Sequence, residues 1–111
     1  MDTRLKELLD HIGKSYRDRI LPQGRHYIEV NVGREAGKLG LGDLGTRFAT
    51  AELIVPLKAP VSGMKVRIDG RTFVNYRRHP SGMAVPGYVA EAAGLATEAY
   101  QAEDSMILNF A

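Results

Sequence analysis

Apolar side chains recur at helical spacing along residues 3–20. They share one face of a helix with 3.6 residues per turn, and the set is Leu5, Leu8, Leu9, Ile12, Tyr16 and Ile20. Asp2 or Thr3 can cap the first turn. Pro22 and Gly24 then end the helix. The spacing therefore predicts an N-terminal amphipathic helix that packs its apolar face on the rest of the chain.

Two strands are predicted next. Residues 26–32 alternate between polar and apolar side chains, which predicts a half-buried strand with Ile28 and Val30 on the buried face. Residues 48–57 predict a second strand, and its end at Pro56 is placed at a sheet edge because proline has no N–H to donate. The intervening residues 33–47 carry five glycines and are predicted to form a long loop.

Residues 64–76 carry the clearest local signal, because two alternating runs flank the dipeptide Asp69-Gly70. This dipeptide is preferred in the two-residue type I′ turn of a β-hairpin. The predicted hairpin pairs Val66 with Phe73 and turns its opposite face to solvent.

The remaining residues complete a mixed fold. Residues 78–82 indicate a turn, residues 83–89 a short strand, residues 88–101 a helix, and residues 105–110 a strand that closes the sheet. Helices and strands do not alternate regularly, so residues 1–111 are predicted to form a single α+β domain. It has an N-terminal amphipathic helix packed on a mainly antiparallel sheet, and a second helix before a C-terminal strand.

Composition narrows the class of protein. The 111 residues are 44% hydrophobic and 25% charged, as is typical of one globular domain. The absence of cysteine excludes disulfides, thiolate catalysis and cysteine-ligated metals. No uncharged apolar run approaches the roughly 18 residues of a membrane span, and the charged N-terminus does not resemble a signal peptide. We therefore expect a soluble, cytoplasmic protein without a membrane partner.

Residues 40–45, GLGDLG, match the G-x-G-x-x-G pattern of a dinucleotide-binding turn. That turn requires a strand running directly into the glycines and a helix after them. Here the preceding strand is predicted to end near Val32, and the residues that follow favour a strand. We interpret the match as a flexible or hairpin-linking loop, whose N–H groups can cradle an anion beside Arg34, Lys38 and Arg47.

Residues 89–100, VAEAAGLATEAY, resemble the centre of a bacterial helix-turn-helix. A recognition helix needs Arg, Lys, Asn or Gln side chains to reach phosphates and base edges. The second segment, TEAYQAED, is net acidic and would be repelled by DNA. We interpret this stretch as a helix with a break or C-cap at Gly94.

Charge is distributed unevenly along the chain. The net charge is +2, yet residues 58–79 contain six Lys or Arg residues against one acid, whereas residues 80–111 contain no Lys or Arg and four acids. Arginine suits bidentate contact with phosphate or carboxylate. The alternative is that these charges cover a solvated strand and discourage aggregation. We define the basic band as the candidate ligand-binding set Lys65, Arg67, Arg71, Arg77, Arg78, His79 and Ser81.

No catalytic constellation is visible in the sequence. His11, His26 and His79 have no metal-ligand spacing to one another. No serine lies in a G-x-S-x-G context, and no pair of carboxylates signals acid–base chemistry. We therefore expect neither a metal nor a cofactor, and we favour a non-enzymatic protein.

The leading functional hypothesis is a small binding or interaction module that uses the basic band to bind an anionic ligand or an acidic partner. One alternative is a small enzyme or small-molecule sensor with its site in the glycine-rich segment 33–45. A second is a homo-oligomeric assembly protein without a ligand, because small α+β chains often bury apolar surface in twofold dimers. A third, less favoured, is a nucleic-acid-binding protein. We expect a homo-oligomer, with a dimer favoured.

Overall fold

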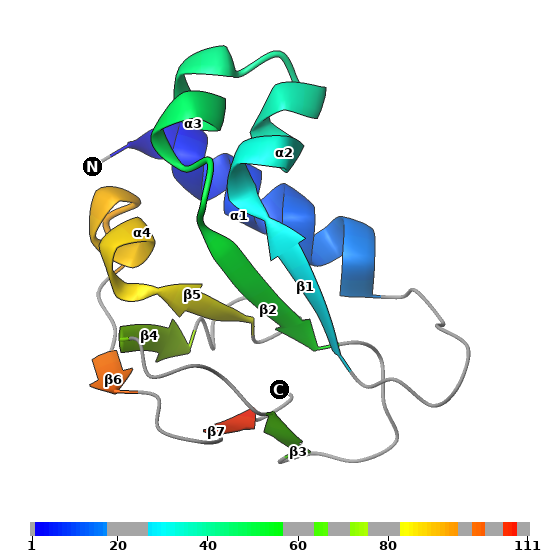
Figure 1. Cartoon of the computed structure of the whole chain (residues 1–111), viewed down its shortest axis with the longest axis vertical. Coiled ribbons are helices and arrows are strands. Elements are labelled where there is room, and N and C mark those ends of the chain that lie inside the picture. Colours follow the sequence, from blue (N-terminus) through cyan, green and yellow to red (C-terminus); the bar gives the residue numbers. More distant parts are fainter. Residues whose placement is uncertain are drawn as a thin grey trace.

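The chain is described from a computed structural model, in which residues 2–17, 27–56, 64–66, 72–75, 83–95, 99–101 and 106–108 are described. Their elements follow in chain order (Figure 1). They are α1 (Thr3–Arg17), β1 (Tyr27–Asn31), α2 (Val32–Lys38), α3 (Gly42–Arg47), β2 (Glu52–Pro56), β3 (Met64–Val66), β4 (Thr72–Asn75), β5 (Ala84–Pro86), α4 (Gly87–Ala92), β6 (Ala99–Gln101) and β7 (Met106–Leu108).

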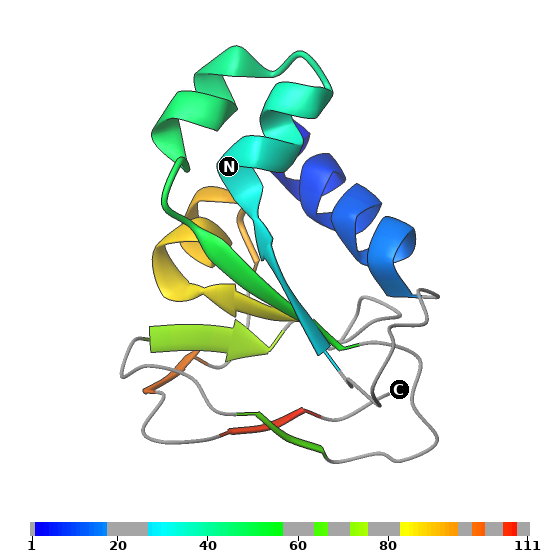
Figure 2. The same ribbon diagram turned by 45° about the vertical axis from the view of Figure 1, so that its right-hand side comes forward.

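The main sheet is antiparallel and has the strand order β1-β2-β5-β4-β6. A separate antiparallel pair joins β3 to β7. Figures 1 and 2 show β1 at one edge of the main sheet beside α1, with α2 and α3 rising from the end where β1 stops and β2 begins. The predicted α+β class, with an N-terminal helix on an antiparallel sheet, is confirmed.

Helix α1 forms as its pattern predicts. Its apolar stripe is buried from Leu5 to Tyr16, and each buried leucine contributes about 1.5–3 kcal/mol relative to an exposed one. The carboxylate of Asp2 accepts a hydrogen bond from the Leu5 N–H at 3.2 Å, which identifies Asp2 as the capping residue. Ile20 lies outside the described residues.

The register of β1 with β2 assigns the two faces of the sheet. Val30 lies opposite Leu53, and both belong to the core cluster that contains the stripe of α1. Ile54 points to the other face and is also buried, together with Phe73. Both faces of the sheet are therefore covered at these positions. The end of β2 at Pro56 pairs with Tyr27, and the β2–β5 pairing is at Ile54.

The prediction of a long loop over residues 33–47 is wrong, because this segment forms α2 and α3. Asn31 caps α2 by accepting a hydrogen bond from the Arg34 N–H at 2.8 Å. Gly40 has φ = 74° and ends α2 in a Schellman motif, with the Leu41 N–H bonded to the Ala36 carbonyl at 2.9 Å. The five glycines are therefore compatible with helices that are held by caps and packing.

The helix predicted over residues 88–101 is shorter than expected. It ends at Ala92, and residues 99–101 instead form β6. Gly94 has φ = 69°, and the Leu95 N–H bonds to the Ala90 carbonyl, so this end is also a Schellman motif. The interpretation of Gly94 as a C-cap is confirmed. The strand predicted at residues 83–89 is β5 alone, because Gly87 already begins α4.

The predicted hairpin between residues 64–68 and 71–76 is wrong. Val66 lies opposite Met106, while Phe73 lies opposite Pro86 on one side and Tyr100 on the other. Both edges of β4 are thus occupied, and β3 has no edge of β4 to join. Phe73 and Val74 are both buried, as is typical of a strand that has neighbours on both edges and is covered on both faces. The C-terminal strand was predicted to close the main sheet, but β7 pairs with β3 instead. Residues 69 and 70 lie outside the described residues.

Two glycines of α2 provide a matched test of this packing. A Cβ atom at Gly33 would lie 2.7 Å from both the Ala49 Cα and the Gly45 carbonyl oxygen, whereas a Cβ at Gly37 would meet nothing within 4 Å. Gly33→Ala is expected to lower the free energy of unfolding by about 1–3 kcal/mol through overpacking. Gly37→Ala is expected to raise it by about 0.5–1 kcal/mol. Urea denaturation measures both, and equal effects would contradict the packing of α2 against α3.

Candidate functional site

The structure describes only one residue of the basic band. Lys65 lies in β3, opposite Ile107 of β7. The other six members, Arg67, Arg71, Arg77, Arg78, His79 and Ser81, lie outside the described residues. The basic band therefore stays a prediction. Among the described residues, a different candidate site lies where α1, β1 and α2 meet.

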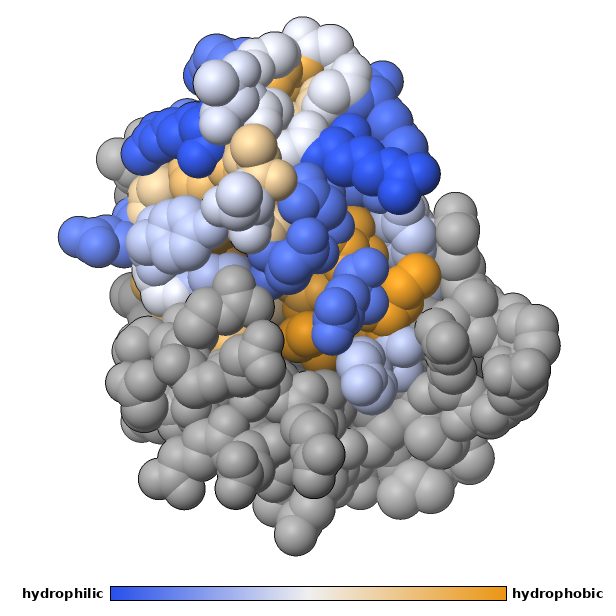
Figure 3. Space-filling view, in the orientation of Figure 1, coloured by the Kyte–Doolittle hydropathy of each residue, from blue (hydrophilic) through white to orange (hydrophobic). Residues whose placement is uncertain are grey.

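The predicted alternative site, segment 33–45, borders a pocket of about 250 Å³. We call it the edge pocket. Its lining comes from three elements: Tyr16 of α1, residues 28–31 of β1, and Arg34, Glu35 and Lys38 of α2. Figure 3 shows apolar side chains over the region of β1 and β2, framed by hydrophilic ones. Two of the three cations noted beside the glycines in the sequence, Arg34 and Lys38, are thus brought to one pocket.

Residues 28–31 of β1 line the edge pocket. No described strand pairs with the edge of β1 that faces away from β2, and we call this its free edge. The Val32 N–H donates to the Ala51 carbonyl at 2.8 Å, one step beyond the Asn31–Glu52 pair of the ladder. Backbone groups alternate in direction along an antiparallel strand. The N–H and carbonyl of Val30 therefore point toward β2. The N–H and carbonyl of Glu29 and the N–H of Asn31 point the opposite way, beyond the free edge of the sheet.

Glu35 is the buried charged residue of this site, with 7% of its surface exposed. The Tyr16 hydroxyl donates to its Oε1, and the Lys38 Nζ donates to the same oxygen at 3.4 Å. Burying a carboxylate is unfavourable unless it is paired and hydrogen-bonded. These two contacts supply that compensation and tie α1 to α2 at the pocket wall.

Asn31 holds the other wall in place. Its Nδ2 donates to the Ala49 carbonyl at 2.8 Å and to the Glu52 Oε1 at 2.9 Å. Its Oδ1 accepts from the Arg34 N–H. One side chain thus joins the end of β1, the start of β2 and the first turn of α2. Its contact with the Arg34 N–H also determines the position of Arg34 in that turn.

The charges of the edge pocket are unevenly paired. Lys38 forms an ion pair with Glu35. Among the described residues, no ion pair or side-chain hydrogen bond is formed by the guanidinium of Arg34 or the carboxylate of Glu29, and both residues are exposed. The pocket therefore presents one cation and one anion that a ligand can contact.

Sequence reasoning missed Tyr16 and Glu35 as a pair. Tyr16 fitted the apolar stripe of α1, and Glu35 lay in a segment expected to be a loop. The available signal was Asn31 followed by Glu35 and Lys38, which is the pattern of a capped helix with an acidic first turn and a basic last turn.

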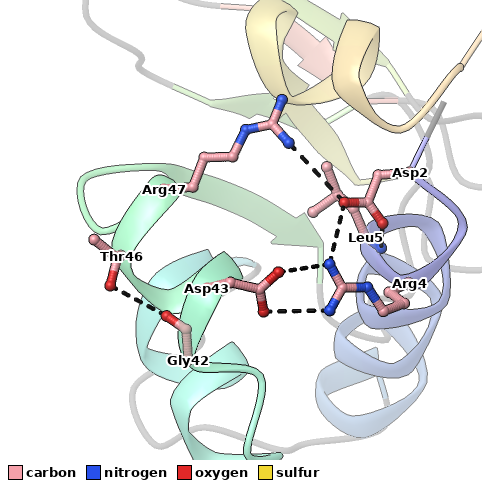
Figure 4. Close-up of polar contacts among 7 residues, drawn as sticks. All are labelled: Asp2, Arg4, Leu5, Gly42, Asp43, Thr46 and Arg47. Carbon is pink, nitrogen blue, oxygen red and sulfur yellow. Dashed lines mark hydrogen bonds and ion pairs between the residues drawn. The ribbon is translucent and has the colours of Figure 1, made fainter.

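A second polar surface joins the start of α1 to α3 (Figure 4). Arg4 donates to both carboxylate oxygens of Asp43, at 2.5 and 3.3 Å. Asp2 lies 3.8 Å from Arg4 and 4.0 Å from Arg47. The hydrogen bond from Arg4 holds the pKa of the Asp43 carboxyl below its ordinary value, and the same bond raises the pKa of Arg4. Arg4 and Arg47 both have carboxylate partners within the chain. Their ion pairs attach α3 to the start of α1.

The described ranges contain no group of three or more His, Asp or Glu side chains that could hold a metal ion. Within the same ranges, no helix has the length and apolar character needed to cross a bilayer.

The fold and site define a small α+β domain in which β1, paired on one edge only among the described strands, lies beside a polar pocket. The chain belongs to the family described as "Domain of unknown function (DUF8294)", whose model matches residues 6–109. Neither a curated protein nor a solved structure matches the chain.

Removing the hydroxyl at the wall of the edge pocket tests its energetic role. Tyr16→Phe leaves the buried carboxylate of Glu35 without one donor, so the free energy of unfolding is expected to fall by about 1–3 kcal/mol. Tyr88→Phe, at a half-exposed tyrosine of α4, is the matched control and should change it by less than about 0.5 kcal/mol. A double-mutant cycle with Glu35→Gln measures the coupling, and additive effects would contradict it.

The Arg4–Asp43 pair predicts a pH-dependent contribution to stability. A carboxyl whose pKa is lowered in the folded chain stabilises it above the unfolded pKa of about 3.9, and this contribution is lost as the pH falls through the folded pKa. Urea denaturation at low salt should therefore show Arg4→Gln less stable than wild type at neutral pH, with the difference closing as the pH falls below the unfolded pKa and through the lower folded pKa of Asp43. Lys6→Gln, on the same helix, should show no such closing difference.

Proposed function

We propose that this domain is a small-ligand-binding module, and that the edge pocket binds a small molecule carrying an anionic group. The observation that carries this proposal is that Arg34 lines a pocket and that its guanidinium has no carboxylate partner among the described residues. Arginine is suited to bidentate contact with a carboxylate or phosphate. The leading hypothesis from the sequence also predicted an anionic ligand, but at the basic band. The site proposed here lies instead in segment 33–45, the location given by the first alternative hypothesis.

The size and lining of the edge pocket support a small, polar ligand. Its volume of about 250 Å³ is slightly below the roughly 300–1,000 Å³ of pockets for drug-sized molecules. Ile28 and Val30 give it an apolar part. Glu29 adds a free carboxylate near Arg34, so a ligand that also carries a hydrogen-bond donor matches the pocket better than a simple anion does.

The buried wall supports binding more directly than it supports catalysis. The Tyr16 hydroxyl and the Glu35 carboxylate contact each other, and these contacts make the wall rigid. Rigid walls reduce the ordering that a ligand would otherwise impose on the protein, which favours affinity. The edge pocket is thus supported as a preformed site on three elements.

Calorimetric titration with acetate, succinate, glutamate and inorganic phosphate tests the proposal. At least one of these probes is expected to bind wild type, and Arg34→Gln is expected to weaken that binding at least tenfold, equivalent to about 1.4 kcal/mol. Arg47→Gln removes an exposed arginine of α3 outside the edge pocket and is expected to leave the affinity unchanged. Equal affinity of wild type and Arg34→Gln, or no binding by any probe, would refute the proposal.

A further inference from the structure

We propose that the edge pocket receives the carboxyl-terminal end of an extended peptide, which adds to β1 as a further strand and places its terminal carboxylate against Arg34. This inference rests on the proposed function, since it names the ligand class of the same site. It uses a feature that a simple anion would leave unused, namely the backbone groups on the free edge of β1.

The backbone on this edge is arranged for strand addition. The N–H and carbonyl of Glu29 and the N–H of Asn31 point away from β2, as the ladder and the Val32–Ala51 hydrogen bond require. Both residues line the edge pocket. Outward groups of this kind are the ones that bind an extended peptide by main-chain hydrogen bonds.

The position of Arg34 determines the direction of the peptide. β1 runs from Tyr27 to Asn31, and Arg34 follows it in the first turn of α2. A peptide whose terminal carboxylate meets Arg34 therefore runs parallel to β1. The opposite direction would bring an α-ammonium group to the same guanidinium, where like charges repel. β1 has five residues, so the bound segment is short.

A second copy of this chain that pairs in the register centred on Glu29 fits the same edge less well. Twofold antiparallel pairing of β1 with its copy, centred on Glu29, would set two carboxylates directly opposite each other. Like charges at such positions are destabilising. It would also bring no carboxylate terminus to Arg34. The observations therefore favour a carboxylate-terminated peptide as the occupant.

Amide hydrogen exchange on ¹⁵N-labelled protein tests the inference. The probes are a mixed-sequence pool of N-acetylated tetrapeptides with free carboxylates, the same pool amidated at the C-terminus, and N-acetylalanine as a small carboxylate. In the free chain, the Glu29 amide is expected to exchange fast and the Val30 amide slowly. The free-carboxylate pool is expected to slow the Glu29 and Asn31 amides at least tenfold, and the amidated pool to bind at least tenfold more weakly.

Two variants separate the peptide backbone from the charge. Glu29→Pro removes an outward N–H that β2 does not use, and proline is tolerated on edge strands. Glu29→Ala removes the same carboxylate but keeps the N–H, and should bind the pool at least tenfold more tightly than Glu29→Pro. Arg34→Gln should lose preference for the free carboxylate, whereas Arg47→Gln should keep it.

The outcomes distinguish this inference from the proposed function. If N-acetylalanine binds through Arg34 as tightly as the pool and the Glu29 amide stays unprotected, the anion site stands and strand addition is overturned. Equal binding of the amidated pool, or slow exchange of Glu29 in the free chain, would also overturn it. If neither the peptides nor the small carboxylate bind, the proposed function fails together with the inference.

Discussion

The side-chain amide of Asn31 stabilises the junction on which the rest of the site depends. It caps α2 through the Arg34 N–H, and it bonds to the Ala49 carbonyl and to Glu52 across the sheet. These three contacts determine how the chain leaves β1 and where α2 begins. The burial of Glu35 and the exposure of Arg34 follow from that starting point, because the two residues are neighbours in the helix and project in different directions.

A buried charge and a free charge perform different tasks at the edge pocket. Glu35 has its donors within the protein and contributes rigidity where α1 meets α2. Arg34 is exposed, and its guanidinium forms no ion pair among the described residues. The exposed Arg4–Asp43 pair attaches α3, which follows α2 in the chain, to the start of α1. The segment is therefore held by α1 through Tyr16 and through Arg4, while Arg34 stays exposed at the edge pocket.

Much of the fold could be predicted from side-chain spacing, because α1 and β1 each bury one regular face, as Leu5 and Val30 show. The glycine-rich segment could not, since its helices depend on a cap at Asn31 and on the close approach of Gly33 to Gly45, which propensity does not reveal. Strand pairing failed for a related reason. β4 pairs with β5 and β6, which follow later in the chain, whereas the dipeptide Asp69-Gly70 carries information only about a local turn. The contact of Tyr16 with Glu35 could not be predicted either, because Glu35 lies in the segment that was predicted to be a loop.

The segment between β1 and β2 leaves the sheet and returns to it at one place. The Val32 N–H bonds to the Ala51 carbonyl, and the Gly33 N–H bonds to the Phe48 carbonyl. The strands on either side stay in continuous register from Tyr27–Pro56 to Asn31–Glu52. In topological terms, α2 and α3 are an excursion at the tip of a β-hairpin, so the register does not depend on their length. A change in the length or sequence of this excursion can therefore alter the chemistry beside β1 without shifting the register of the two strands.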